Sequence, residues 1–118
     1  MELRCLIVDD SPRFLQAARR LLEQQGVRVV GVAATGHEAV ERAGALRPDV
    51  ALVDVGLGAE NGFEVASRLG RTPVIMISTM GEEELAPLLA GNRAIGFLPK
   101  ADLSAAAIAW LLSAPEGR

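Results

Sequence analysis

Five short apolar runs alternate with segments of helical periodicity along this 118-residue chain. The runs have the length of β-strands and are apolar apart from Arg4 and Arg28; they cover residues 3–8, 27–33, 50–53, 74–77 and 94–98. Continuously apolar strands separated by helices are typical of a parallel sheet covered on both faces. The pattern predicts one α/β domain, residues 1–118, in which ligands bind beyond the carboxyl ends of the strands.

Capping residues mark where the helices begin and end. Ser11 and Pro12 fit an N-cap and a first helical residue, and Gly26 fits the end of that helix. Thr35 with Glu38 fits a capping box. The third helix is expected to end near residue 69, the fourth to begin near residues 82–84, and the last to cover residues 102–113.

Composition excludes several broad classes of protein. Fifteen acidic and twelve basic residues give a net charge of −3, and no block of basic residues offers a nucleic-acid surface. No apolar stretch approaches the roughly 20 residues of a membrane span. Asp9 and Asp10 interrupt the first apolar run, which argues against a secretory leader, so we expect a cytoplasmic protein. Cys5, the only cysteine, is expected to pack as a small hydrophobic residue.

Polar residues stand just after four of the five predicted strands. They are Asp9, Asp10, Asp54, Ser78, Thr79 and Lys100. Each alone has an ordinary explanation, such as a helix cap, a turn hydroxyl or a surface lysine. Their occurrence together at successive strand ends favours a shared site, because these ends converge on one edge of such a sheet.

The chemistry of this set suits transfer of a phosphoryl group to a carboxylate. Three carboxylates in one small site repel one another, and a hard cation such as Mg²⁺ relieves that repulsion. A hydroxyl can bind a phosphoryl oxygen, and a lysine ammonium can balance its charge. The groups needed for in-line transfer are therefore all present.

Four segments, LIVDDSP, ALVDVGLGAENGFE, PVIMIST and GFLPKADL, together resemble the receiver domains of two-component response regulators. The last two most resemble receivers that precede a helix-turn-helix DNA-binding domain. The resemblance extends over essentially the whole chain. It implies a flavodoxin-like, doubly wound (βα)5 fold with strand order 2-1-3-4-5, and a phosphoprotein that switches in response to a sensor histidine kinase.

The resemblance also implies a role for each site residue. Asp54 is the nucleophile that becomes an aspartyl phosphate. Mg²⁺ is held by Asp10 directly, by Asp9 mainly through water, by Asp54 and by the backbone carbonyl of Gly56. The remaining implied residues are Ser78 and Lys100, which contact the phosphoryl group, Phe97 at the aromatic switch position, and Thr79 beside the site.

Two positions depart from the family pattern. Gly58 stands where the family often has proline, so the loop is expected to be more mobile. Thr79 stands where alanine or glycine is common, and is expected to narrow access to Asp54.

The implied partners are a histidine kinase, a second copy through the surface of helix four, strand five and helix five, and a DNA-binding output domain outside this chain. No charged residue lies between Asp102 and Glu116, which predicts that the last helix buries a second face against a partner. Within it, Leu103, Ala107 and Trp110 are expected to pack one way, and Ile108, Leu111 and Leu112 to point around the helix.

Two other functions compete with this interpretation. A magnesium-dependent phosphohydrolase with an aspartyl-phosphate intermediate would commonly carry a second aspartate two residues after the nucleophile, where Gly56 stands. A flavodoxin-like cofactor binder would place its phosphate loop after the first strand, where Asp9 and Asp10 repel phosphate. We therefore expect that the protein is not an enzyme, except that it catalyses its own phosphorylation and dephosphorylation.

Overall fold

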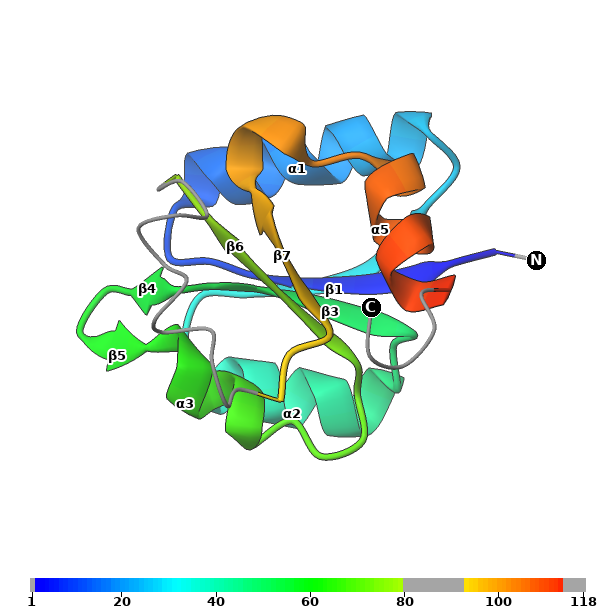
Figure 1. Ribbon diagram of the computed structural model, residues 1–118. Coiled ribbons are helices and arrows are strands. Elements are labelled where there is room, and N and C mark those ends of the chain that lie inside the picture. Colours follow the sequence, from blue (N-terminus) through cyan, green and yellow to red (C-terminus); the bar gives the residue numbers. More distant parts are fainter. Residues whose placement is uncertain (1, 80–92, 114–118) are drawn as a thin grey trace.

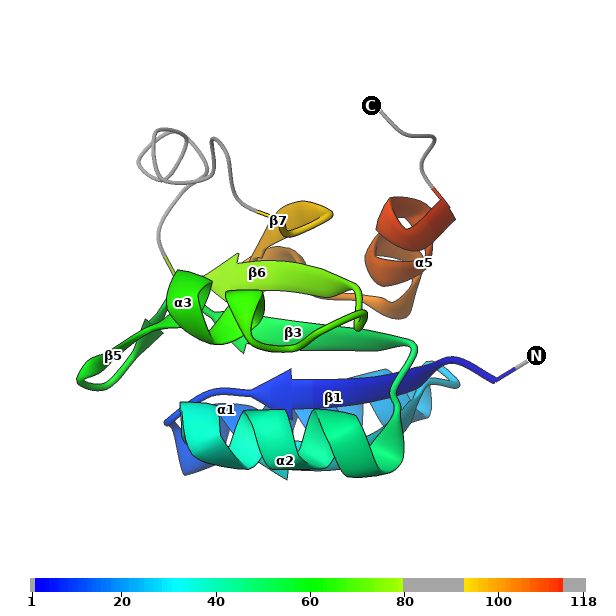
Figure 2. The same cartoon turned by 90° about the horizontal axis from the view of Figure 1, so that it is seen from below.

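The computed structural model describes residues 2–79 and 93–113, which form a three-layer α/β domain (Figures 1 and 2). Five parallel strands make the central sheet in the order β2-β1-β3-β6-β7. They are β1 (Arg4–Val8), β2 (Arg28–Ala33), β3 (Val50–Asp54), β6 (Val74–Ser78) and β7 (Gly96–Pro99). The strands β4 and β5 form a small separate hairpin, so β6 and β7 are the fourth and fifth strands of the main sheet. The observed order is therefore the predicted 2-1-3-4-5.

Helices cover both faces of the sheet. One face carries α1 (Pro12–Gln24) and α5 (Ala105–Ser113), and the other carries α2 (Gly36–Leu46) and α3 (Gly62–Ser67) (Figure 1). The fourth helix predicted from residues 82–84 onward lies outside the described residues. No helix in the part of the chain that is described has both the length and the apolarity to cross a bilayer.

Alternation along the strands divides the core into two halves. Leu6 and Val8 of β1 face α2 and α3, while Cys5 and Ile7 face α1 and α5. All four are fully buried. Burial also raises the pKa of the Cys5 thiol to about 12, so this residue is a protonated core side chain, as predicted.

Helix starts follow the predicted caps closely. The Ser11 hydroxyl accepts a hydrogen bond from Phe14 N at 3.2 Å, and the Thr35 hydroxyl accepts one from Glu38 N at 3.1 Å. Glu38 in turn accepts from Ala34 N at 2.8 Å, one residue earlier than in the usual capping box. The two N-caps fix where α1 and α2 leave the carboxyl edge of the sheet.

The last helix differs from the prediction. It begins at Ala105, after a 3-10 turn at Lys100–Asp102. Ile108 is fully buried, with Leu111 and Leu112 packed against the same core, because residues spaced by three and four share one helix face. Trp110, expected to pack, is instead 55% exposed. The predicted packing was therefore wrong for Trp110, and right for Leu103, which is buried in the core.

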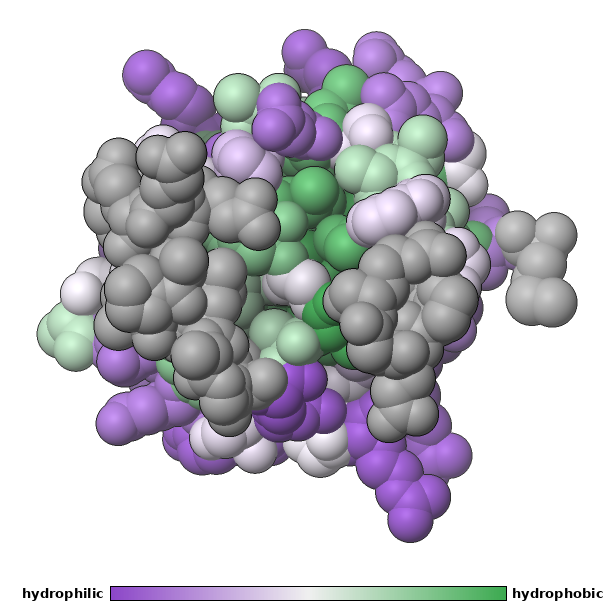
Figure 3. Space-filling view, in the orientation of Figure 1, coloured by the Kyte–Doolittle hydropathy of each residue, from purple (hydrophilic) through white to green (hydrophobic). Residues whose placement is uncertain are grey.

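The side of the molecule that presents β6 and β7 has a hydrophobic centre and a hydrophilic rim (Figure 3). Every residue of β7 is only partly buried, in contrast to the fully buried β6. Arg93, just before β7, donates hydrogen bonds to the carbonyls of Ala66, Gly70 and Thr72 at 2.8–3.1 Å. This guanidinium ties the start of β7 to the end of α3.

The glycine-rich segment after β3 folds into a hairpin that the sequence did not predict. Gly56–Leu57 (β4) pairs with Glu60–Asn61 (β5), and Gly58 makes the turn with a φ of 59°. Proline cannot adopt a positive φ, so the departure from the family pattern at this position suits the hairpin. Whether the loop is more mobile stays a prediction.

We predict that Gly62→Ala destabilises the domain. A Cβ built at Gly62 would lie 1.9 Å from the carbonyl oxygen of Asp54, so the backbone that carries the site would have to shift. Overpacking of this kind costs about 1–3 kcal/mol. The free energy of unfolding in urea measures the effect.

The matched control is Gly44→Ala in α2, where a Cβ meets nothing within 4 Å. Removing a glycine from a helix interior stabilises by about 0.5–1 kcal/mol, so the two variants should shift stability in opposite directions. Equal stability of Gly62→Ala and the wild type would contradict the close approach.

Candidate phosphoacceptor site

The predicted site residues meet at the carboxyl edge of the sheet. Val8 pairs with Val53 in the β1–β3 register, which places Asp9 and Asp10 beside Asp54. In the neighbouring register Asp54 pairs with Ile77, so Ser78 follows immediately on β6. Ser78 pairs with Pro99 of β7, and Lys100 comes next. The strand alignment thus brings together groups far apart in sequence.

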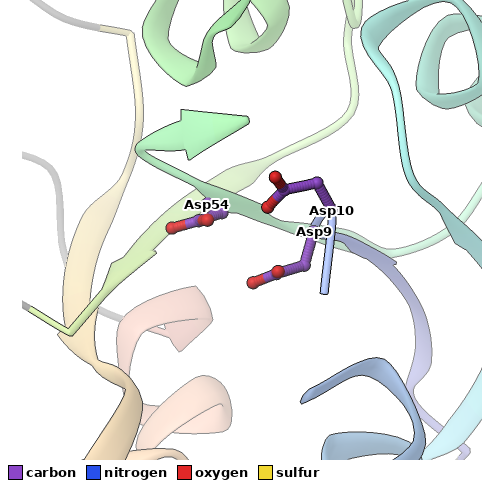
Figure 4. Close-up of side chains that lie close together, drawn as sticks. All are labelled: Asp9, Asp10 and Asp54. Atoms are coloured by element: carbon purple, nitrogen blue, oxygen red, sulfur yellow. The ribbon is translucent and has the colours of Figure 1, made fainter. Parts of the chain in front are cut away.

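Three carboxylates form the centre of the site (Figure 4). One oxygen from each of Asp9, Asp10 and Asp54 lies within 4.8 Å of the others. Asp9 is fully buried and Asp10 is exposed, while the Asp54 side chain is 13% exposed. The site is therefore open to solvent on the Asp10 side and closed beneath Asp9.

Lys100 supplies the cation that balances part of this charge. Its Nζ lies 2.6 Å from Asp9 Oδ2 and 3.8 Å from Asp54 Oδ2. The lysine side chain is only 15% exposed, so the contact with Asp9 is weakly screened by water. In this state Lys100 is paired mainly with Asp9, and Asp54 is its more distant neighbour.

The two oxygens of Asp9 have different surroundings. Oδ1 accepts a hydrogen bond from Ser11 N at 2.9 Å, which joins the end of β1 to the start of α1. Oδ2 is buried and forms no hydrogen bond of good geometry with the described residues, although it has the Lys100 ion pair. A buried carboxylate oxygen that can accept further hydrogen bonds is well suited to interact with a bound cation.

Burial raises the pKa of Asp54 to about 6, and the neighbouring Asp9 carboxylate adds to the rise. The Lys100 ammonium and a hydrogen bond from the Gly56 backbone N–H oppose it. The Asp54 carboxylate is thus destabilised in its charged form, although it remains mostly ionised at pH 7. Placing such a carboxylate among like charges is typical of functional sites.

The donor set fits a hard divalent cation. It consists of carboxylate oxygens at one open site, and Mg²⁺ prefers a few carboxylates together with water and phosphate oxygens. Asp10, the exposed member, is accessible to such an ion from solvent. The acidic cluster is therefore of the kind at which a magnesium ion can be held.

The other predicted residues lie on or directly after the strands that carry this site. Ser78 is 4% exposed at the end of β6, and Thr79 beside it is exposed. Phe97 is half-buried on β7 and packs against the core half that faces α2 and α3. The hairpin strand β4 begins at Gly56, two residues beyond Asp54.

Sequence analysis missed three contacts that hold the site in place. Gly62 approaches the Asp54 carbonyl, with Gly62 N donating to Val55 O at 2.8 Å. Glu60 of the hairpin accepts a hydrogen bond from Gly36 N at the start of α2, at 2.9 Å. Phe14 lies with its ring 4.2 Å from Lys100 Nζ. No spacing rule links these partners.

Comparison with known proteins agrees with the geometry. Residues 5–108 match the response regulator receiver domain family. The chain belongs to this family. A protein-glutamate methylesterase/protein-glutamine glutaminase from Alkalilimnicola ehrlichii is 40% identical over 114 residues, and a putative transcriptional regulator from Pseudomonas aeruginosa is 36% identical over 101 residues. These matches cover 88% and 82% of this receiver but only 29% and 49% of the relatives' lengths.

Among solved structures, the signal receiver domain of the putative response regulator NarL from Mycobacterium tuberculosis superposes with a TM-score of 0.82 at 31% identity. The match covers 99% of this chain and 98% of that one. The fold and the receiver function predicted from the sequence are thereby confirmed. The phosphohydrolase alternative is not favoured by these relatives.

We predict that Asp54→Asn stabilises the metal-free receiver at pH 7. With a folded-state pKa of about 6 against an unperturbed 3.8, the wild type loses stability as pH rises through this window. Two pKa units correspond to about 3 kcal/mol, which we reduce to about 1–2 kcal/mol because the carboxylate is partly hydrated.

Urea unfolding in EDTA at several pH values measures this effect. The advantage of Asp54→Asn should shrink between pH 7 and pH 4, where the wild-type carboxyl is protonated in the folded state. Asp102→Asn, at an exposed position outside the cluster, is the control for removal of one negative charge. An advantage of Asp54→Asn that is independent of pH would contradict the raised pKa.

Proposed function

We propose that Asp54 is the residue of this receiver domain that accepts a phosphoryl group, from a sensor histidine kinase. The observation that carries the proposal is that Asp54 shares one small site with the other two carboxylates and has the Lys100 ammonium 3.8 Å from its Oδ2 atom. A carboxylate oxygen of Asp54 would attack phosphorus, and the donor would leave on the opposite side. The buried Ser78 and the neighbouring Lys100 would then contact the phosphoryl oxygens.

The proposal assigns the magnesium ligands to Asp10, Asp54 and the Gly56 carbonyl, with Asp9 acting mainly through water. A bound magnesium ion would neutralise charge on the carboxylates and on the transferred group. Meanwhile Asp9 fixes Lys100 at 2.6 Å, and the Ser11 N–H orients Asp9. Asp9 therefore supports the site through the lysine and through its contribution to the local negative charge.

The proposed consequence is a change of surface near β6 and β7. Lys100 and Ser78 stand at the ends of these two strands, and Phe97 lies on β7. A phosphoryl group that draws Lys100 and Ser78 toward Asp54 would favour a different position of β7, whose residues are all only partly buried. Phosphorylation would in this way shift an equilibrium between two surfaces.

We also propose that the receiver acts as part of a larger regulator. The relatives include proteins at least twice as long as the matched segment, one described as a transcriptional regulator and one as a methylesterase and glutaminase. The receiver carries no proposed enzymatic activity beyond its own phosphorylation and dephosphorylation. Its resemblance to receivers that precede a helix-turn-helix domain makes a DNA-binding output domain our preferred partner.

We predict one phosphoryl adduct, on Asp54. Incubation with acetyl phosphate and Mg²⁺ should add one phosphoryl mass to the wild type and none to Asp54→Asn. Excess EDTA should abolish the adduct, and Asp10→Asn should reduce both its rate of formation and the affinity for Mg²⁺. Intact-mass spectrometry and calorimetric titration measure these quantities. The assignment would be refuted by a stable adduct on Asp54→Asn.

A final prediction concerns self-association through α5. This helix is part of the proposed dimer surface, which also includes β7 and the fourth helix predicted from the sequence. Trp110 is exposed on an uncharged helix, and an exposed tryptophan is favourable at an interface. Phosphorylation should raise the dimer fraction in sedimentation velocity, and Trp110→Glu should weaken the dimer at least tenfold. Ala17→Glu, at an exposed position of α1, is the matched control. Monomers under every condition would exclude the homodimer.

A further inference from the structure

The ring of Phe14 lies against the same ammonium that contacts the acidic cluster. Lys100 Nζ is 4.2 Å from the ring centroid, within the range of a cation–π interaction. Phe14 is partly buried in the first turn of α1 and packs against the core half beneath that helix. The lysine head group is thus contacted by an aromatic face as well as by Asp9.

The start of α1 aligns both of these contacts. Asp9 Oδ1 accepts from Ser11 N at 2.9 Å, and the Ser11 hydroxyl accepts from Phe14 N at 3.2 Å. Asp9 Oδ2 and the Phe14 ring then meet the same Nζ atom. Ser11 therefore does more than begin a helix, because its N–H and hydroxyl connect the carboxylate and the residue whose ring contacts Lys100.

A lysine without such contacts would be poorly located. Its four-carbon stem is flexible and its ammonium is strongly hydrated, so the head group favours open water. At the observed position the ammonium is 3.8 Å from Asp54, close enough to reach an oxygen of a group attached there by a short displacement. The ammonium thus has the Phe14 ring at 4.2 Å and the Asp54 carboxylate at 3.8 Å, and the lysine side chain is only 15% exposed.

We infer that Phe14 is a positioning residue for phosphorylation, which acts by holding the Lys100 ammonium beside Asp54. The inference rests on the proposed role of Asp54 as phosphoacceptor. It assigns to the first turn of α1 a part in the reaction that its apolar spacing alone does not indicate. Replacing the ring by an aliphatic side chain should slow phosphorylation without removing any group that touches the phosphoryl donor.

The test compares Phe14→Leu, which removes the π face, with Phe14→Tyr, which keeps it. Each is made with Lys100 present and with Lys100→Met, and phosphorylation by acetyl phosphate with saturating Mg²⁺ is followed by intact mass. Phe14→Leu should be roughly threefold to tenfold slower than wild type, and Phe14→Tyr close to wild type. With Lys100→Met, Phe14→Leu should cause no further loss.

The same factor of loss in both backgrounds would mean that Phe14 acts on the fold of α1 and not on Lys100, and would overturn the inference. An unchanged rate in Phe14→Leu would also overturn it. Failure of the underlying function looks different, because Asp54→Asn would then still accept the phosphoryl group.

A second measurement needs no phosphorylation and covers the case in which Lys100→Met folds poorly. Exchange of the Lys100 ammonium protons with water, followed by NMR, should be faster in Phe14→Leu than in the wild type. In Phe14→Tyr it should be unchanged. Equal exchange in all three proteins would show that the ring does not hold the ammonium, whatever the phosphorylation rates.

Discussion

The ion pair between Asp9 and Lys100 joins the two halves of this site and fixes the arrangement around it. Asp9 directly follows β1, while Lys100 follows β7 at the edge of the sheet, and their charged atoms are 2.6 Å apart in a largely buried environment. A buried pair of this kind adds little net stability, but loss of either partner leaves an uncompensated buried charge. The pair therefore specifies position more than it stabilises the fold.

The remaining carboxylates keep the site under electrostatic strain. Burial and the neighbouring Asp9 raise the pKa of Asp54 to about 6, so the ionised site opposes folding at neutral pH. A cation or a phosphoryl group with its metal would relieve this repulsion. The domain tolerates the strain because two apolar core halves, one on each face of the sheet, support the strands that present the acids.

Backbone contacts restrict where Asp54 can lie. Its carbonyl faces Gly62 at a distance that excludes any side chain there, and the hairpin between them is attached to α2 through Glu60 and Gly36. The nucleophile of a phosphoryl transfer must be located to within a fraction of an ångström. These contacts hold the glycine-rich segment that follows β3, and so restrict movement of the end of the strand that presents Asp54, the proposed phosphoacceptor.

The sequence by itself determined the layers, the number of sheet strands and the identity of the acidic residues, and the resemblance to receiver domains implied the order of the strands. Strand-length apolar runs and capping residues depend on local physics, and the carboxyl ends of parallel strands must share one edge. That shared edge, together with the resemblance of the surrounding segments to receiver domains, was enough to predict that the carboxylates, the hydroxyl and the lysine lie in one site.

Only the tertiary structure decided which atoms meet. The pairing of Lys100 with Asp9 in preference to Asp54, the ring of Phe14 over the ammonium, and the approach of Gly62 to Asp54 depend on side-chain reach and loop path. The exposure of Trp110 likewise depends on packing: Ile108, Leu111 and Leu112 fill the core under α5, which leaves Trp110 on the opposite face of the helix. Such distances arise from packing across the whole domain, which local periodicity does not encode.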